Sequence, residues 1–170
     1  GKEKLCKDIT LDDLDEYDKE CLLSGGFQLL PQKDKAGRQV FACFGSLRKF
    51  KTILNQLRTL YFLFMSMGES EDAQKRGLTM ISYSVGRCKD GMGGHGCVEA
   101  VNMVMRLPVH VASVHLCCDD VMECALNTMA VGAFSVKVKA RFKLHYGSHV
   151  ECRYSLRGLG FPEASLPLSL

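Results

Sequence analysis

Histidine and cysteine side chains gather in one short stretch of the sequence. His110, His115, Cys117 and Cys118 lie close together, and His145 follows further along the chain. Imidazole and thiolate groups are the ligands that zinc prefers, and a thiolate beside an imidazole can act as a nucleophile. On a strand, His115 and Cys117 would share a face, but no second ligand pair completes a tetrahedron. We therefore predict neither a metal site nor a catalytic residue in this stretch.

The glycine-rich stretch Gly86–Gly96 is the second place where the sequence could hold a ligand. Backbone N–H groups in loops of this kind can cradle phosphates. This stretch lacks the Gly-Lys-Ser/Thr ending of a P-loop, and we predict a flexible loop. The sequence also contains neither the G-x-S-x-G nucleophile elbow nor the H-E-x-x-H zinc motif. We expect no enzyme chemistry and no cofactor.

The composition is that of an ordinary globular domain. Of the 170 residues, 46% are hydrophobic and 24% are charged, which suits a single domain over residues 1–170. No apolar run is long enough to span a bilayer. The nine cysteines are odd in number and include no C-x-x-C pair, which favours reduced thiols over disulfides. We expect a cytoplasmic monomer that binds no nucleic acid.

The central segment of the predicted fold is Val109–Tyr146. Its pattern predicts a strand, a helix and a second strand, which would position any site. His110–Cys118 is short and apolar, as a buried strand should be, and Asp119 or Asp120 can cap the helix that follows. That helix, Val121–Phe134, carries one charge and is apolar on nearly every face. Such a helix needs apolar surroundings on both sides. One side can be the sheet, and the other is either more core or a lipid or membrane surface.

The strand predicted after this helix alternates apolar and basic residues. In Val136–Tyr146, one face would belong to the core and the other would be basic, which is typical of an edge strand or of a strand with an uncovered face. The basic face could contact an anionic membrane surface. Its four members are Lys137, Lys139, Arg141 and Lys143.

The remaining pattern alternates helices and strands, which predicts an α/β fold with parallel pairing. An acid-rich helix within residues 1–24 follows Thr10 and ends before Gly25, and Phe27–Pro31 reads as an apolar linker. The other predicted elements are a turn at Asp34–Gly37, a strand at Arg38–Phe44, a helix from Gly45 to Met67 that is deeply buried at its end, a turn or short helix at Glu69–Arg76, a strand at Gly77–Val85 buried on both sides, and helices at His95–Leu107 and His149–Leu156.

Five segments, in order, resemble the CRAL-TRIO lipid-binding domain, the family of phosphatidylinositol and tocopherol transfer proteins. The resemblance covers roughly residues 25–167. The segments are Asp34-Lys-Ala-Gly-Arg-Gln-Val-Phe41, Gln74-Lys-Arg-Gly-Leu-Thr-Met-Ile81, Leu107-Pro-Val-His-Val-Ala-Ser-Val-His115, Val138-Lys-Ala-Arg-Phe-Lys-Leu-His145 and Leu159-Gly-Phe-Pro with Leu166-Pro. The three-helix module that precedes this domain in the family is missing here.

The resemblance implies a mostly parallel sheet, flanked by helices, with a mobile gate helix over an apolar pocket. Val121–Phe134 matches the gate, and Gly132 is a plausible hinge. The implied function is binding a phospholipid or isoprenoid and exchanging it with a membrane that the protein contacts peripherally, without chemistry. Ser82, Ser113 and His115 could meet a polar head group or a buried water. The candidate pocket walls are Tyr83, Val85, Val114, Leu116, Cys118, Val121, Met122, Ala125, Leu126, Met129 and Phe134.

Two other functions stay open. The chain could be a scaffold that keeps this fold without a ligand and binds proteins or membranes, because Cys118-Asp119-Asp120 replaces the family's Asn-x-Pro entry to the gate helix. It could also be an enzyme with a reactive cysteine paired with His110, His115 or His145, although no spacing selects a pair.

Overall fold

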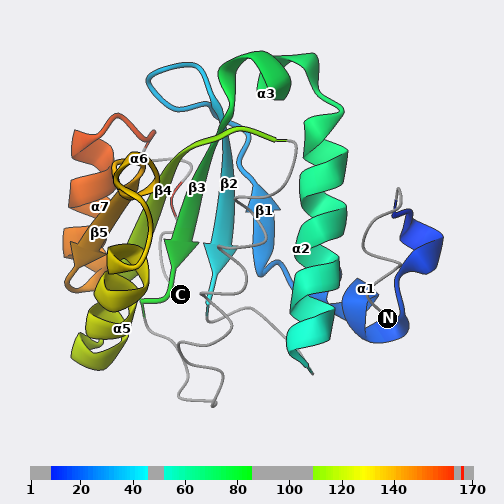
Figure 1. The fold of residues 1–170 in the computed structure, drawn as a ribbon, viewed down its shortest axis with the longest axis horizontal. Coiled ribbons are helices and arrows are strands. Elements are labelled where there is room, and N and C mark those ends of the chain that lie inside the picture. The colour runs from blue at the N-terminus through cyan, green and yellow to red at the C-terminus, as the bar shows by residue number, and fades with distance from the viewer. Residues whose placement is uncertain (1–8, 46–51, 86–108, 163–165, 167–170) are drawn as a thin grey trace.

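A five-stranded sheet with helices on both faces organises the protein (Figure 1). The computed structural model describes residues 9–45, 52–85, 109–162 and 166. The elements in chain order are η2 Leu11–Asp13, α1 Glu16–Leu23, β1 Phe27–Leu29, β2 Gln39–Phe44, α2 Ile53–Gly68, α3 Glu71–Arg76, β3 Leu78–Tyr83, β4 Val111–Cys118, α5 Val121–Gly132, α6 Val136–Lys139, β5 Phe142–Tyr146 and α7 His149–Gly158.

The strands lie in the order β1-β2-β3-β4-β5, and β2 to β5 are parallel. The α/β prediction is therefore confirmed as a mixed, mostly parallel sheet. β1 is antiparallel to β2, with Phe27 opposite Cys43. The prediction of a linker at Phe27–Pro31 was wrong, because Gly25, at a φ of 75°, ends the turn after α1 and lets the chain return along β2.

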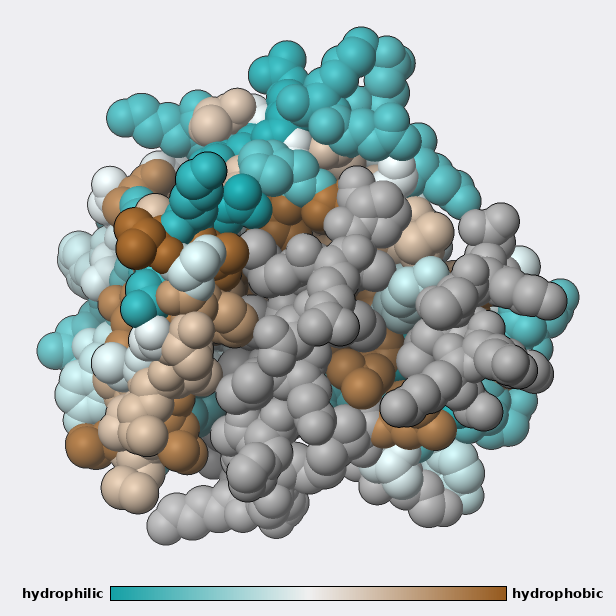
Figure 2. All heavy atoms as spheres, viewed as in Figure 1, coloured by the Kyte–Doolittle hydropathy of each residue, from teal (hydrophilic) through white to brown (hydrophobic). Residues whose placement is uncertain are grey.

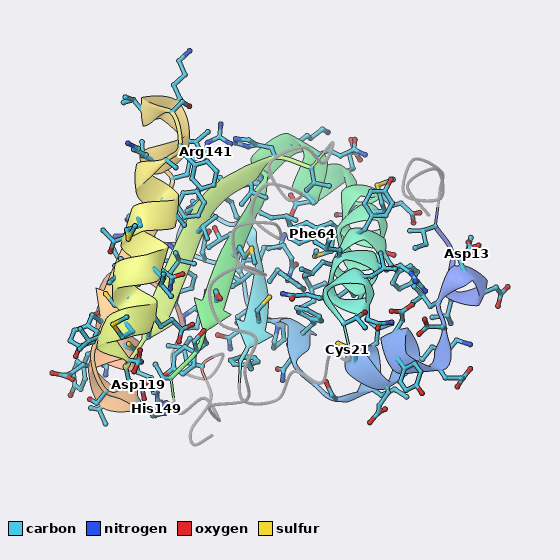
Figure 3. The ribbon with its side chains drawn as sticks, turned by 60° about the horizontal axis from the view of Figure 1, so that its bottom comes forward. Asp13, Cys21, Phe64, Asp119, Arg141 and His149 are labelled. Carbon is cyan, nitrogen blue, oxygen red and sulfur yellow. The ribbon has the colours of Figure 1, made fainter. Side chains whose placement is uncertain are left out.

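Alternation along the strands separates two cores. One lies between the sheet and helices α2 and α5, and it contains Phe41, Phe64 and Val114. Figure 3 shows Phe64 on α2, and this side chain is fully buried. The other core lies on the opposite face, where Tyr83 and Leu156 bring β3 and α7 together. The prediction that β3 is buried on both faces is confirmed.

Helix α2 presents one buried stripe rather than deep burial all round. Leu60 and Phe64 are buried, whereas Leu54 is half exposed and the side chains of residues 61–63 are partly exposed. The predicted start of this helix covers residues 45–51, most of which lie outside the described residues. Within the described part, Thr52 caps the helix by accepting a hydrogen bond from Asn55 N.

The N-terminal helix begins later than predicted. Asp15, rather than Thr10, caps α1, because its side chain accepts the Asp18 N–H while the Asp18 carboxylate accepts the Asp15 N–H. Asp18 is fully buried and receives the Arg58 guanidinium at 2.8 Å. This part of the acidic helix is therefore bound to α2 rather than solvated.

The prediction of one strand over Val136–Tyr146 was wrong in its first half. Ser135 begins a single helical turn, α6, and β5 starts only at Phe142, opposite Val114. Val136 is exposed on this turn instead of lying in the core. Only residues 142–146 pair with β4, so the Val-Lys-Val-Lys repeat is not part of the sheet. β5 does lie at the sheet edge, as predicted.

The predicted glycine-rich loop and the helix at His95–Leu107 lie outside the described residues. Among the helices that the structure describes, none combines the length and apolar character needed to cross a membrane.

Candidate functional site

Helix α5 follows β4 directly and lies along the sheet beside β4 and β5 (Figure 1). Asp120 caps it by accepting the Glu123 N–H at 2.8 Å, which confirms the predicted cap. The helix ends at Gly132 rather than at Phe134. Phe134 then turns back to the sheet and stacks on Phe142, with ring centroids 5.7 Å apart.

Helix α5 turns much of its apolar surface to solvent. Val121, Met122 and Met129 are 65%, 69% and 72% exposed, whereas the polar Asn127 is only 8% exposed. Leu126 and Ala125 are exposed beside them. Hydrophobic side chains gather over this helix in Figure 2. A helix of a globular protein normally turns its apolar stripe to the core.

Basic residues follow the apolar face of α5 along the chain. Lys137 and Lys139 of α6 are exposed within a few residues of the end of α5. Neither lysine makes an ion pair within the described part of the chain. We call the exposed residues of α5 and α6 the α5–α6 surface; its members are Val121, Met122, Ala125, Leu126, Met129, Val136, Lys137 and Lys139.

The predicted pocket walls do not come together in one place. Val114 and Leu116 are buried in the core that contacts α2, and Cys118 lies beside Cys124 of α5. Tyr83 and Val85 instead belong to the core on the α7 face, where the Tyr83 hydroxyl contacts His149 Nδ1 at 2.6 Å. Grouping them with Val114 was wrong, because alternation along β3 points them to the other side of the sheet.

The three predicted polar residues also divide between the faces. Ser113 and His115 line a cavity of about 220 Å³ on the α7 face. Ser82 does not line this cavity and alternates with Ile81 and Tyr83, so it faces the α2 side. We call this space the polar cavity; its lining residues are Asp34, Lys35, Ala36, Arg38, Ser113, His115, Lys143, Leu159 and Phe161.

A hydrogen-bonded carboxylate forms one wall of the polar cavity. Asp34 accepts the N–H groups of Ala36 and Arg38 at 2.9 Å, the Thr79 hydroxyl at 2.8 Å and Arg38 Nε at 2.7 Å. Burial would raise the pKa of Asp34, but the hydrogen bonds from Arg38 and Thr79 outweigh it and hold the pKa below 3.8. The predicted turn at Asp34–Gly37 is confirmed, with Gly37 at a φ of 75°.

His115 also lines the polar cavity, and its imidazole stacks on that of His145. His115 Nδ1 lies 3.0 Å from His145 Nε2, and the edge of His115 meets Phe161. Burial, helped by His145 and Lys143, lowers the pKa of His115 to about 4. His115 is therefore neutral at pH 7. The sequence predicted His115 as a site residue, but it did not predict that Asp34, Arg38 and His145 would surround it.

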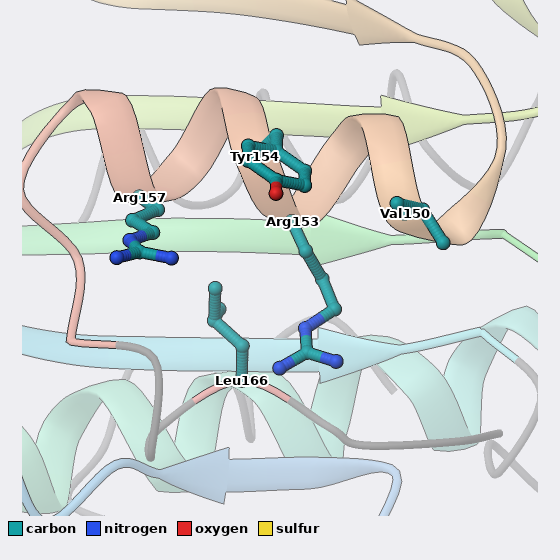
Figure 4. Close-up of a pocket in the computed structure, with 5 residues that line it drawn as sticks. All are labelled: Val150, Arg153, Tyr154, Arg157 and Leu166. Atoms are coloured by element: carbon teal, nitrogen blue, oxygen red, sulfur yellow. The ribbon is translucent and has the colours of Figure 1, made fainter.

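A smaller cavity of about 90 Å³ lies between α7 and Leu166 (Figure 4). Val150, Arg153, Tyr154 and Arg157 line it together with Leu166 near the C-terminus. This cavity and the polar cavity both lie on the α7 side of the sheet, away from α5.

Most of the described cysteines are buried, and the hydrogen bond between Cys117 and Cys152 lowers the pKa of Cys152. Cys117, Cys118 and Cys152 are buried. A hydrogen bond shared with Cys152, together with burial, raises the pKa of Cys117, and burial raises that of Cys118 to about 12. No group of three or more metal-ligating side chains occurs among the residues that the structure describes.

No known protein-family model matches this sequence. A search of curated proteins finds no match either.

Proposed function

We propose that the protein binds a hydrophobic lipid and exchanges it with a membrane, and that the α5–α6 surface is its membrane contact. The observation that carries this proposal is the apolar face that α5 turns to solvent. Three large apolar side chains, Val121, Met122 and Met129, point to solvent while Asn127 is buried. Exposed contiguous apolar side chains of this kind are typical of interaction sites.

A bilayer matches this surface because its acyl chains can take up the apolar side chains and its anionic head groups can bind the lysines. Transfer of each of the three exposed side chains out of water would contribute about 1–2 kcal/mol. Lys137 and Lys139 would each add roughly 1 kcal/mol at an anionic membrane surface. An apolar helix face bordered by lysines is the arrangement found in helices that lie in the membrane interface.

The position of α5 supports lipid exchange rather than membrane binding alone. The helix lies over the α2-side core, and its inner side offers that core few large side chains; Val131 is one that packs there. Gly132 ends the helix, and its position is open. We infer that α5 moves away from the sheet and lets an acyl or prenyl chain enter beneath it. The order of the CRAL-TRIO-like segments along the chain supports the same function.

A charge placed on the α5–α6 surface should abolish membrane binding. We expect Met122→Glu with Met129→Glu to lower binding to vesicles of phosphatidylcholine and phosphatidylserine by about tenfold or more, because carboxylates resist transfer from water. Binding of the unchanged protein should also weaken with salt, since lysine contacts are screened over about 8–10 Å. Vesicle co-sedimentation measures both effects.

Leu23→Glu is the matched control, because Leu23 is 88% exposed on α1, at the other end of the molecule (Figure 1). Equal loss of binding in the control variant would contradict the proposal. Lipid extraction and mass analysis of the purified protein should identify a bound lipid. A protein free of lipid that also fails to transfer lipid between vesicles would leave only membrane binding.

The alternative is a scaffold that binds another protein through the same surface. The packed positions of Val114 and Leu116 favour it, because these predicted pocket walls already contact the α2 side of the core. This alternative predicts no vesicle binding by the unchanged protein, and no bound lipid.

A further inference from the structure

We propose that the polar cavity binds a phosphate group, free or carried by a phosphomonoester, through Lys35, Arg38 and Lys143. This site lies on the α7 face and does not depend on the α5–α6 surface. The proposal rests on the charge of the cavity, on the way its cations are held, and on its size.

The charge of the cavity is positive. Three cationic side chains and one carboxylate, that of Asp34, line it. The ammonium groups of Lys35 and Lys143 make no ion pair within the part of the chain that the structure describes. Asp34 is the only acid among the lining residues, and His115, uncharged at pH 7, adds no charge to the cavity.

The single carboxylate is already fully engaged. Asp34 accepts two backbone N–H groups, the Thr79 hydroxyl and Arg38 Nε. Thr79 gives its only hydroxyl proton to Asp34, so the Ser113 hydroxyl, 3.0 Å away, must donate to Thr79. This chain of donors leaves Asp34 little capacity to bind the lysines.

Two of the three cations have contacts that place them at the cavity, although Lys35 and Lys143 are both exposed. Arg38 is anchored through Nε, which leaves its two terminal nitrogens without a hydrogen-bond partner among the described residues. The stem of Lys35 packs on Gly160, where an added Cβ would lie 2.7 Å from Lys35 Cβ. Gly160 also has a φ of 88°, so glycine is favoured there for two reasons.

The shape suits a small, hydrated anion. About 220 Å³ exceeds the roughly 30 Å³ that one water occupies in the liquid, so a phosphate and several waters fit. Arginine and lysine nitrogens around a phosphate form charge-assisted hydrogen bonds. Leu159 and Phe161 give the cavity an apolar side against which the carbon part of a phosphomonoester could rest.

Titration with inorganic phosphate, followed by calorimetry and ³¹P NMR, tests the site. We expect Lys35→Gln with Lys143→Gln to weaken phosphate binding by about tenfold or more. The control, Lys137→Gln with Lys139→Gln, removes the same charge from exposed lysines of α6 and should bind phosphate normally. Unchanged thermal unfolding will show that both double variants are folded.

A second arm separates the two sources of phosphate. Vesicles of phosphatidylcholine with phosphatidic acid present a lipid-borne phosphomonoester. If Lys35→Gln with Lys143→Gln lowers binding to these vesicles more than it lowers binding to vesicles of phosphatidylcholine with phosphatidylserine, which carry no phosphomonoester, the site takes a lipid phosphate; if it affects only free phosphate, the ligand is soluble. The proposal would be overturned if the unchanged protein did not bind inorganic phosphate. It would also be overturned if both double variants lost the same fraction of their affinity for inorganic phosphate. Met129→Glu should leave phosphate binding intact even if membrane binding fails.

Discussion

His115 is an uncharged imidazole packed between His145 and Phe161. Burial is the largest cause of its lowered pKa, and the charges of Lys143 and Arg38 act in the same direction, while Asp34 opposes them. The pKa of the neighbouring His145 is lowered as well, by burial and by Lys143. Folding therefore requires both rings to stay neutral where an unfolded chain would take up protons.

This arrangement predicts a loss of stability in mild acid. Above pH 6.5 the folded and unfolded states are both neutral at His115, so this group contributes no pH dependence. Between pH 6.5 and about 4 the unfolded state binds a proton that the folded state does not, and the free energy of unfolding falls. By pH 5 we expect His115 alone to lower it by up to about 2 kcal/mol.

Urea unfolding at pH 7.5 and pH 5 measures this loss. His115→Leu should reduce the difference between the two pH values, whereas His110→Gln, at an exposed position, should keep it. An undiminished pH dependence in His115→Leu would show that other groups cause it.

At the scale of elements, α5 is the segment whose movement the proposed lipid exchange requires. Gly132 has no positive φ, and a Cβ added there would contact nothing within 4 Å. Alanine is therefore sterically permitted and should stabilise the helix end by a few tenths of a kcal/mol up to about 1 kcal/mol. If the freedom of the Gly132 backbone lets α5 open, Gly132→Ala will slow lipid transfer between vesicles.

Gly158→Ala in α7 is the matched control, because its Cβ would also meet no neighbour within 4 Å. It should leave the transfer rate unchanged. Equal transfer rates for Gly132→Ala and the unchanged protein would exclude Gly132 as a hinge.

Most elements could be predicted because one strong local signal defined each. Asp120 before an apolar run predicted α5, and the apolar run before residue 86 predicted β3. The wrong predictions came from short sequence patterns that are compatible with two different secondary structures. Val136–Lys139 alternates like a strand but becomes a helical turn, because the neighbouring strand β4 pairs only with residues 142–146. β1 is too short, at three residues, to show a period.

At the scale of the whole molecule, the sheet separates two candidate sites. The α5–α6 surface lies on the side of α2 and α5, and the polar cavity lies on the side of α7. The sequence predicted the α5 residues of the first site as pocket walls on one helix, whereas the structure exposes them, and it placed Val136 in the core rather than on this surface. It could not predict the second, because Asp34, Ser113 and Lys143 come together only once the four parallel strands β2 to β5 have set their register.

The central claim is that the outward face of α5 enters a bilayer, and a single fluorescent reporter tests it most directly. The chain contains no tryptophan, so Met129→Trp introduces one at the centre of the α5–α6 surface. With anionic vesicles, we predict a blue shift of its emission, quenching by brominated acyl chains and protection from aqueous iodide. Leu23→Trp, on α1, should show none of these changes. Emission from Met129→Trp that stays red-shifted and open to iodide on vesicles would contradict the account.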